Sequence, residues 1–204
     1  MNIKEKVKNY YSKKSKFSIF SDIIFAAFII ALIIPQSRVE VIALINKARV
    51  LVLQPSVEDN DEIISLTDND YNWSAKNING ETVELSELKG KVIFVNLWAT
   101  WCPPCIAEMP SIEKLYNIYK DNDKIAFLIV SNEDEEKVKA FMEKRGFKFP
   151  VYVSNFKLPQ VLSTESIPTT FLVSKSGKIV VKQVGATNWH GDKMQSIVNK
   201  LIAE

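Results

Sequence analysis

The chain has 204 residues, of which 47% are hydrophobic and 25% are charged, and its formal net charge is +2. The length and composition predict one sizeable globular domain with appendages. The lysine excess is confined to the first sixteen residues, so the charge distribution excludes a nucleic-acid-binding surface. The only two cysteines, Cys102 and Cys105, are too few for a disulfide-stapled small protein or a four-ligand zinc site, so we expect no metal and no cofactor.

The N-terminus combines a basic segment, residues 1–16, with an apolar run over residues 17–34 that Pro35 ends. A helix of that length reaches about 27 Å, close to the roughly 30 Å core of a bilayer. We therefore predict a single transmembrane anchor over residues 17–35. The lysine excess before it places the N-terminus in the bacterial cytoplasm and the remaining chain outside the cytoplasmic (inner) membrane. The alternative is a cleaved signal peptide, which would export the remaining chain equally.

Residues 36–62 are expected to connect this anchor to the domain. Apolar residues recur at helical spacing over 36–54, which predicts a juxtamembrane helix that lies on the lipid bilayer or leads into the domain. A helix that docks a partner is the alternative. The acidic, polar stretch over 55–62 is interpreted as a linker.

The segment over 63–204 alternates strand and helix patterns. In chain order we expect a hairpin of 71–76 and 82–85 around a type I′ turn at Asn79-Gly80, a strand over 92–98, a helix over 102–120, a strand over 125–130, a helix over 134–145, a strand over 149–153, a hairpin of 169–174 and 178–184, and a helix over 189–202. This order predicts an α/β domain with a mixed central sheet and helices on both faces.

The pentapeptide Trp101-Cys102-Pro103-Pro104-Cys105 follows a buried strand, where a helix is expected to begin. Free backbone N–H groups and the positive end of the helix dipole favour negative charge there, and the thiolate is the attacking species. We therefore predict that Cys102 is the more exposed, nucleophilic sulfur and that Cys105 resolves a reversible Cys102–Cys105 disulfide. A permanent stabilising disulfide is the alternative, but a bridge over so few residues removes little loop entropy.

The segment over 98–105, Pro110 in the following helix, and Ile167-Pro168-Thr169 resemble the thioredoxin fold. The leading hairpin and the insert over 120–149 resemble its membrane-anchored TlpA/ResA-type branch. This resemblance covers residues 66–204 and implies an extracytoplasmic thiol–disulfide oxidoreductase, several of whose relatives serve cytochrome c maturation.

The resemblance further implies a reductant of disulfide-containing envelope proteins, supplied with electrons by a membrane-embedded dithiol carrier. Two alternatives stay open. One is an oxidase or isomerase that forms disulfides, which the reduction potential distinguishes. The other is a non-catalytic binding or chaperone module, in which both cysteines would be dispensable.

The loop at Pro168 is implied by the resemblance to contain a cis peptide bond and to face the sulfurs. The backbone of Ile167, next to Thr169 in the same loop, would then pair with an extended partner chain. Trp101 would form part of this docking surface, and simple core packing is its alternative.

The sequence departs from the thioredoxin pattern at Asn96, a position where thioredoxin has a buried aspartate. Two carboxylates are candidates to replace that proton acceptor. Glu108 lies three residues after Cys105 on one helix face, and Glu133 follows the strand over 125–130. Both match glutamates near the active site of ResA-type reductases. The alternative for each is a solvated surface acid, and it is the favoured interpretation for Glu133.

Overall fold

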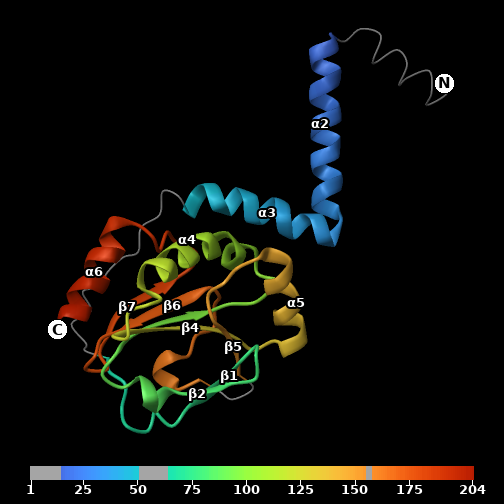
Figure 1. Cartoon of the computed structure of the whole chain (residues 1–204). Helices are drawn as coiled ribbons and strands as arrows, with labels where there is room; N and C mark the ends of the chain where they lie inside the picture. Colours follow the sequence, from blue (N-terminus) through green and yellow to red (C-terminus); the bar gives the residue numbers. More distant parts are fainter. Residues whose placement is uncertain (1–14, 51–63, 155–157) are drawn as a thin grey trace. The chain divides into compact units, whose positions relative to one another are not determined.

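The computed structural model describes residues 15–50, 64–154 and 158–204 of the chain (Figure 1). The chain divides into two compact units, Met1–Ile42 and Ala43–Glu204, and each is described by itself. In the first unit, helix α2 (Lys16–Ile33) begins after Ser15, whose Oγ accepts a hydrogen bond from the Ser18 N–H at 3.3 Å. Helix α3 (Pro35–Val50) follows it, and the boundary between the two units falls within this helix. The predicted linker and most of the predicted basic segment lie outside the described residues.

Apolar side chains of α2 are exposed in this unit, among them Phe17, Phe25 and Ile33. Within the described ranges, no helix has the length and apolarity needed to cross a membrane. The anchor predicted over residues 17–35 is not confirmed and stays a prediction.

The second unit is built on a seven-stranded mixed sheet in the order β2-β1-β5-β4-β3-β6-β7 (Figure 1). Its strands are β1 (Ser74–Asn77), β2 (Thr82–Glu84), β3 (Val92–Leu97), β4 (Ile125–Ser131), β5 (Val151–Val153), β6 (Thr169–Val173) and β7 (Ile179–Val184). Strands β3, β4 and β5 are parallel, and the other neighbouring pairs are antiparallel. Every residue of β3 is buried, which explains the near-continuous apolar run in its sequence.

Of the α-helices in the described residues, three lie wholly within this unit, namely α4 (Pro103–Tyr119), α5 (Glu135–Arg145) and α6 (Asp192–Ala203). They contribute to only one of its two core clusters. The second cluster includes the short 3-10 helices η1 (Leu85–Leu88) and η2 (Gln160–Leu162). Crossovers between parallel strands are right-handed with few exceptions. The crossovers β3–α4–β4 and β4–α5–β5 advance in one direction across the sheet, so this rule places both helices on one face, in agreement with the core cluster that they share. The prediction of helices on both faces holds only in part, because within the described residues the helices of the second cluster are the short 3-10 helices η1 and η2.

The strands predicted over 71–76 and 82–85 are present in shortened form as β1 and β2, but their turn is not type I′. That turn needs a positive φ at both central residues. Gly80 has a φ of 94°, whereas Asn79 does not have a positive φ. The Asn77 Oδ1 accepts hydrogen bonds from the N–H groups of Asn79 and Glu81, each at 2.9 Å. Asn77 therefore stabilises a three-residue loop with glycine at its left-handed position.

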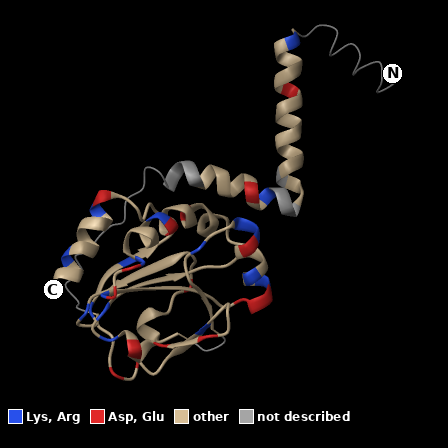
Figure 2. Cartoon of the chain, in the orientation of Figure 1, with Lys and Arg blue, Asp and Glu red and all other residues tan. Residues whose placement is uncertain are grey.

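The buried face of α4 continues to the C-terminal end of the helix through Tyr119. Met109, Ile112 and Leu115 are buried, whereas Ile118 is exposed and Tyr119 is buried. At 3.6 residues per turn, the residue four positions after Leu115 continues the inward stripe. Figure 2 shows charges of both signs along α5 and α6, which is typical of solvated helix faces.

Candidate functional site

Cys102 and Cys105 form a disulfide at the start of α4, with sulfurs 2.07 Å apart. Cys102 is the N-cap of this helix, and the Cys105 N–H donates to Cys102 Sγ at 3.3 Å. The first-turn N–H groups of a helix have no helical acceptor, so one is available to this sulfur. Together with the helix dipole, this hydrogen bond would stabilise a thiolate at Cys102 in the reduced protein.

The oxidised pair is almost inaccessible to solvent. Cys102 is 2% exposed and Cys105 is 1% exposed, so the marked exposure expected of Cys102 is absent from this disulfide form. Pro103 and Pro104 are half-buried in the first turn, where the missing proline N–H costs no helical hydrogen bond. Trp101, directly before Cys102 in the sequence, is 59% exposed and presents apolar surface to solvent.

The loop before β6 lies against the disulfide. The Ile167–Pro168 peptide bond is cis, as the resemblance implied, and the Ile167 carbonyl oxygen lies 3.8 Å from Cys102 Sγ. The hydroxyl of Thr169 donates to the Ser166 carbonyl oxygen at 2.7 Å and fixes the loop. Because β6 pairs antiparallel with β3, the segment before β6 meets the segment after β3. The Ile167 backbone therefore stands where an extended partner chain could pair with it.

Glu108 is fully buried and accepts three hydrogen bonds. Its Oε1 accepts from Asn96 Nδ2 at 2.8 Å, and its Oε2 accepts from Trp189 Nε1 at 2.9 Å and from the Thr187 N–H at 3.2 Å. Burial favours the neutral acid, and it outweighs the three donors, which favour the ionised form, so the pKa of Glu108 is raised to about 7. A carboxyl that titrates near neutrality thus lies one helical turn after Cys105.

Asn96, on β3, links this carboxyl to the strand that follows the cis-proline. It is 1% exposed, and its Nδ2 donates to both Glu108 Oε1 and Thr170 Oγ1, each at 2.8 Å. Asn96 and Thr170 are also partners in the β3–β6 ladder. Because the asparagine amide is uncharged, Glu108 is the group in this network that can hold or release a proton.

Glu133 holds the segment that leads into the disulfide. Its Oε2 accepts from the Thr100 N–H at 2.5 Å, its Oε1 accepts from Thr100 Oγ1 at 3.0 Å, and Lys137 Nζ also donates to Oε1. Burial acts to raise the pKa of Glu133, but the hydrogen bonds from Lys137 and Thr100 outweigh it and lower the pKa. The favoured interpretation of Glu133 as a solvated surface acid does not fit these contacts.

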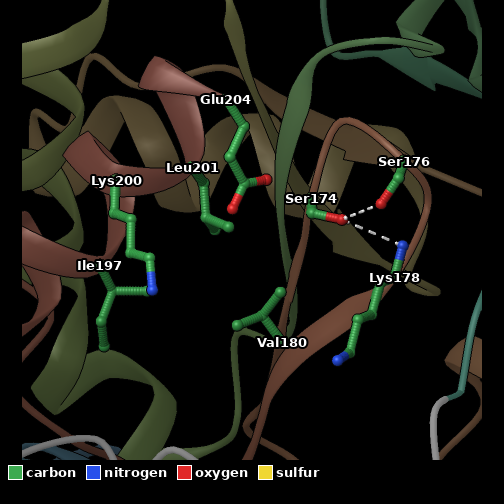
Figure 3. A pocket seen from close by; sticks show the side chains of 8 residues that line it. All are labelled: Ser174, Ser176, Lys178, Val180, Ile197, Lys200, Leu201 and Glu204. Atoms are coloured by element: carbon green, nitrogen blue, oxygen red, sulfur yellow. Dashed lines mark hydrogen bonds between the residues drawn. The ribbon is translucent and has the colours of Figure 1, made fainter.

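A pocket of about 640 Å³ lies beside the cis-proline loop before β6, with Trp101 and Ile167 among its lining residues. Another pocket, of about 450 Å³, is lined by Ser174, Ser176, Lys178, Val180, Ile197, Lys200, Leu201 and Glu204 (Figure 3). Ser174 follows the last residue of β6, whereas the cis-proline precedes the first. The pocket in Figure 3 therefore lies at the far end of β6 from the disulfide.

Sequence reasoning missed Trp189, Thr187 and Thr100 as members of this site. Trp189 and Thr187 lie 81 and 79 positions after Glu108 in the sequence. No local pattern predicts that their N–H groups converge on one carboxylate. The position of Thr100, two residues before Cys102, could have marked it as a member of the site. Its contact with Glu133 could not have been predicted, because that contact depends on the pairing of β3 with β4.

Several known proteins are similar to this chain in sequence and in fold. The model of the Redoxin family matches residues 70–202. The thiol-disulfide oxidoreductase ResA of Halalkalibacterium halodurans is 36% identical over 115 residues, which cover 56% of this chain and 65% of that protein. The match therefore spans a little under two thirds of that relative. A ResA of Bacillus cereus is 30% identical over 146 residues, which cover 70% of this chain and 83% of that protein.

Among solved structures, similarity extends to a thiol:disulfide interchange protein of the thioredoxin family from Chlorobium tepidum TLS. Its TM-score is 0.58 at 25% identity, and the match covers 70% of this chain and 99% of that one. The mixed sheet with its helices is thus a thioredoxin-like α/β fold.

Proposed function

The chain belongs to the Redoxin family, as a thioredoxin-like protein of the predicted TlpA/ResA type, and we propose that it is a thiol–disulfide oxidoreductase acting through Cys102 and Cys105. The oxidoreductase relatives support the predicted enzyme class. One observation carries the proposal: the Cys102–Cys105 disulfide occupies the start of α4, with Cys102 Sγ 3.8 Å from the Ile167 carbonyl oxygen. A sulfur in that position can be both activated by the helix and reached by a docked chain.

In the reducing direction, the Cys102 thiolate attacks one sulfur of a partner disulfide. A mixed disulfide forms, and the other partner sulfur leaves as a thiolate. Cys105 then loses its proton to the Glu108 carboxylate and attacks Cys102 Sγ. The mixed disulfide breaks, the second partner sulfur leaves as a thiolate, and the Cys102–Cys105 disulfide forms. Two electrons have passed from this protein to its partner.

The direction of electron flow follows the family resemblance. As a reductant, the protein would act on disulfide-containing proteins of the cell envelope, including those of cytochrome c maturation. Reduction outside the cytoplasm consumes electrons, so a membrane-embedded dithiol carrier would have to regenerate the Cys102–Cys105 dithiol.

The reduction potential and the exchange rate test this function. We expect the reduced protein to reduce a model disulfide protein such as insulin, and Cys102→Ser to lack this activity. Equilibration with a thiol redox buffer should give a potential nearer the about −270 mV of thioredoxin than the about −120 mV of DsbA. A potential near the latter value would favour the disulfide-forming oxidase. A full biological function without both cysteines would favour the binding or chaperone module.

For the location, the proposal is that α2 anchors the chain in the bacterial cytoplasmic membrane, with the N-terminus in the cytoplasm. The apolar run over 17–34 and the exposed side chains of α2 support it. We expect the chain to stay in the membrane fraction after alkaline carbonate extraction, and protease added to spheroplasts to digest the thioredoxin-like domain. Release of the full-length chain would contradict the anchor, and a shortened soluble form would indicate a cleaved signal peptide.

A further inference from the structure

We propose that Trp189 is a positioning residue for Glu108, and that its indole N–H fixes which carboxylate oxygen exchanges a proton with Cys105. The inference rests on the proposed function, because it assigns a role within the resolving step. The indole N–H of this side chain donates to Glu108, and Trp189 is proposed to act through that carboxyl.

The hydrogen bonds to the two oxygens of Glu108 are unequal. Oε2 accepts from both Trp189 Nε1 and the Thr187 N–H, whereas Asn96 Nδ2 is the single donor to Oε1 within the part of the chain that the structure describes. Each of these three groups can only donate. With two donors, Oε2 has both lone pairs occupied, so the proton of the neutral acid resides on Oε1. Trp189 thereby orients the carboxyl so that Oε1 is the oxygen that takes up and releases the proton.

The indole is held firmly enough to do this. Trp189 is fully buried, and its ring forms a T-shaped pair with the ring of Phe94, with centroids 5.2 Å apart. Its backbone N–H donates to Ser111 Oγ at 3.1 Å, and that hydroxyl donates to the Glu108 carbonyl oxygen at 2.7 Å. The backbone of Trp189 is thus tied to the same helix as the carboxyl that its side chain binds.

In the disulfide form, the pKa of Glu108 is set by burial and by hydrogen bonds. Within the described residues, the groups acting on its carboxyl are Asn96 from β3 and Thr187 and Trp189 from the segment before α6, and none is charged. Removing the indole N–H removes one donor that favours the ionised form. Because a hydrogen bond to a charged group is comparatively strong, the pKa of Glu108 should rise by about one pH unit or more.

The oxidised protein offers a direct test, because the cysteines of a disulfide do not titrate. The chain has four tryptophans, so its indole N–H resonances are few, and Trp189→Phe assigns the relevant one. We expect the Trp189 indole resonance to follow a single titration with a midpoint near pH 7 and to lose this titration in Glu108→Gln. A resonance that stays constant from pH 5 to pH 9 in the folded protein would overturn the inference.

The resolving step supplies a second readout. Trp189→Phe keeps an aromatic ring without the N–H, so at pH 7 the ionised fraction of Glu108, and with it the resolving rate, should fall about fivefold. The rate should recover toward that of the wild type at pH 9. Tyr119→Phe is the matched control, since it removes a hydroxyl that donates to Asn199 Oδ1 between α4 and α6 at 2.8 Å. Its pH profile should match the wild type.

The outcomes separate the inference from the function beneath it. Equal slowing of Trp189→Phe at pH 7 and pH 9 would indicate lost packing and overturn the positioning role. A wild-type protein that exchanges no thiols at any pH would overturn the proposed function. A constant Trp189 resonance in an active protein would overturn this inference alone.

Discussion

Cys105→Ser is expected to accumulate mixed disulfides with partner proteins, at a level roughly tenfold or more above that of Cys102→Ser. With Cys105 replaced, Cys102 can still attack a partner disulfide, but nothing remains to release the partner. Cys102 Sγ accepts the helix-start N–H and lies 3.8 Å from the Ile167 carbonyl oxygen, whereas Cys105 lies inside the first turn. Non-reducing electrophoresis of trapped complexes, followed by mass spectrometry, measures the difference.

The double serine variant is the control, because any complex that it forms does not depend on thiol exchange. Equal trapping by the two single variants would contradict the separate roles of nucleophile and resolving thiol. If neither folded single variant trapped a partner, the thiol-exchange mechanism itself would fall, and the binding or chaperone alternative would gain weight.

The parts of the site that lie close together in the sequence could be predicted from it. The continuous apolar run of β3 requires burial on both faces, and prolines directly after Cys102 suit only the first turn of a helix. These two local facts placed the dithiol at a strand-to-helix junction. The cis bond before Pro168 was not local in this sense, because only the resemblance to thioredoxin implied it.

The contacts that tune the site could not be predicted, because they depend on how distant segments meet. Helical spacing placed Glu108 on the same face as Cys105, but its burial depends on Trp189 and Thr187 from the far end of the domain. Glu133 is a second example, because a glutamate in this sequence context is expected to be a solvated surface residue. The contact that its carboxylate makes with Thr100 exists only because β4 pairs with β3.

Glu108→Gln should remove a pH dependence from the stability of the oxidised protein. The pKa of the Glu108 carboxyl is raised from its ordinary 4.5 to about 7 by burial. Between these values the folded protein binds more protons than the unfolded chain, so the free energy of unfolding falls as pH rises. The contribution, about 3 kcal/mol, is fully present below pH 4.5 and lost above pH 7. Urea unfolding of both oxidised proteins from pH 4 to pH 8 measures it.

The variant is expected to fold, because its amide can reuse the existing partners. The new oxygen can accept from Trp189 and Thr187, and the new amide group can donate to Asn96 if the Asn96 amide turns over. The hydroxyl of Thr170 tolerates that turn, since it can donate as well as accept. Glu113→Gln makes the same substitution elsewhere on α4, where the carboxylate accepts only the Lys148 N–H at 2.7 Å among the bonds described, and serves as the control.

In the reduced protein, Glu108→Gln should lower the apparent thiol pKa values and slow the resolving step. The carboxylate disfavours a thiolate nearby, and it is also the acceptor for the Cys105 proton, so its loss makes the thiols more acidic yet hinders their resolution. The two thiols and Glu108 titrate as a coupled set, and only macroscopic values can be compared. Alkylation rate against pH, for wild type and variant, measures them. Superimposable profiles would deny Glu108 this role and would leave Glu133, through Thr100, as the carboxylate that acts on the dithiol.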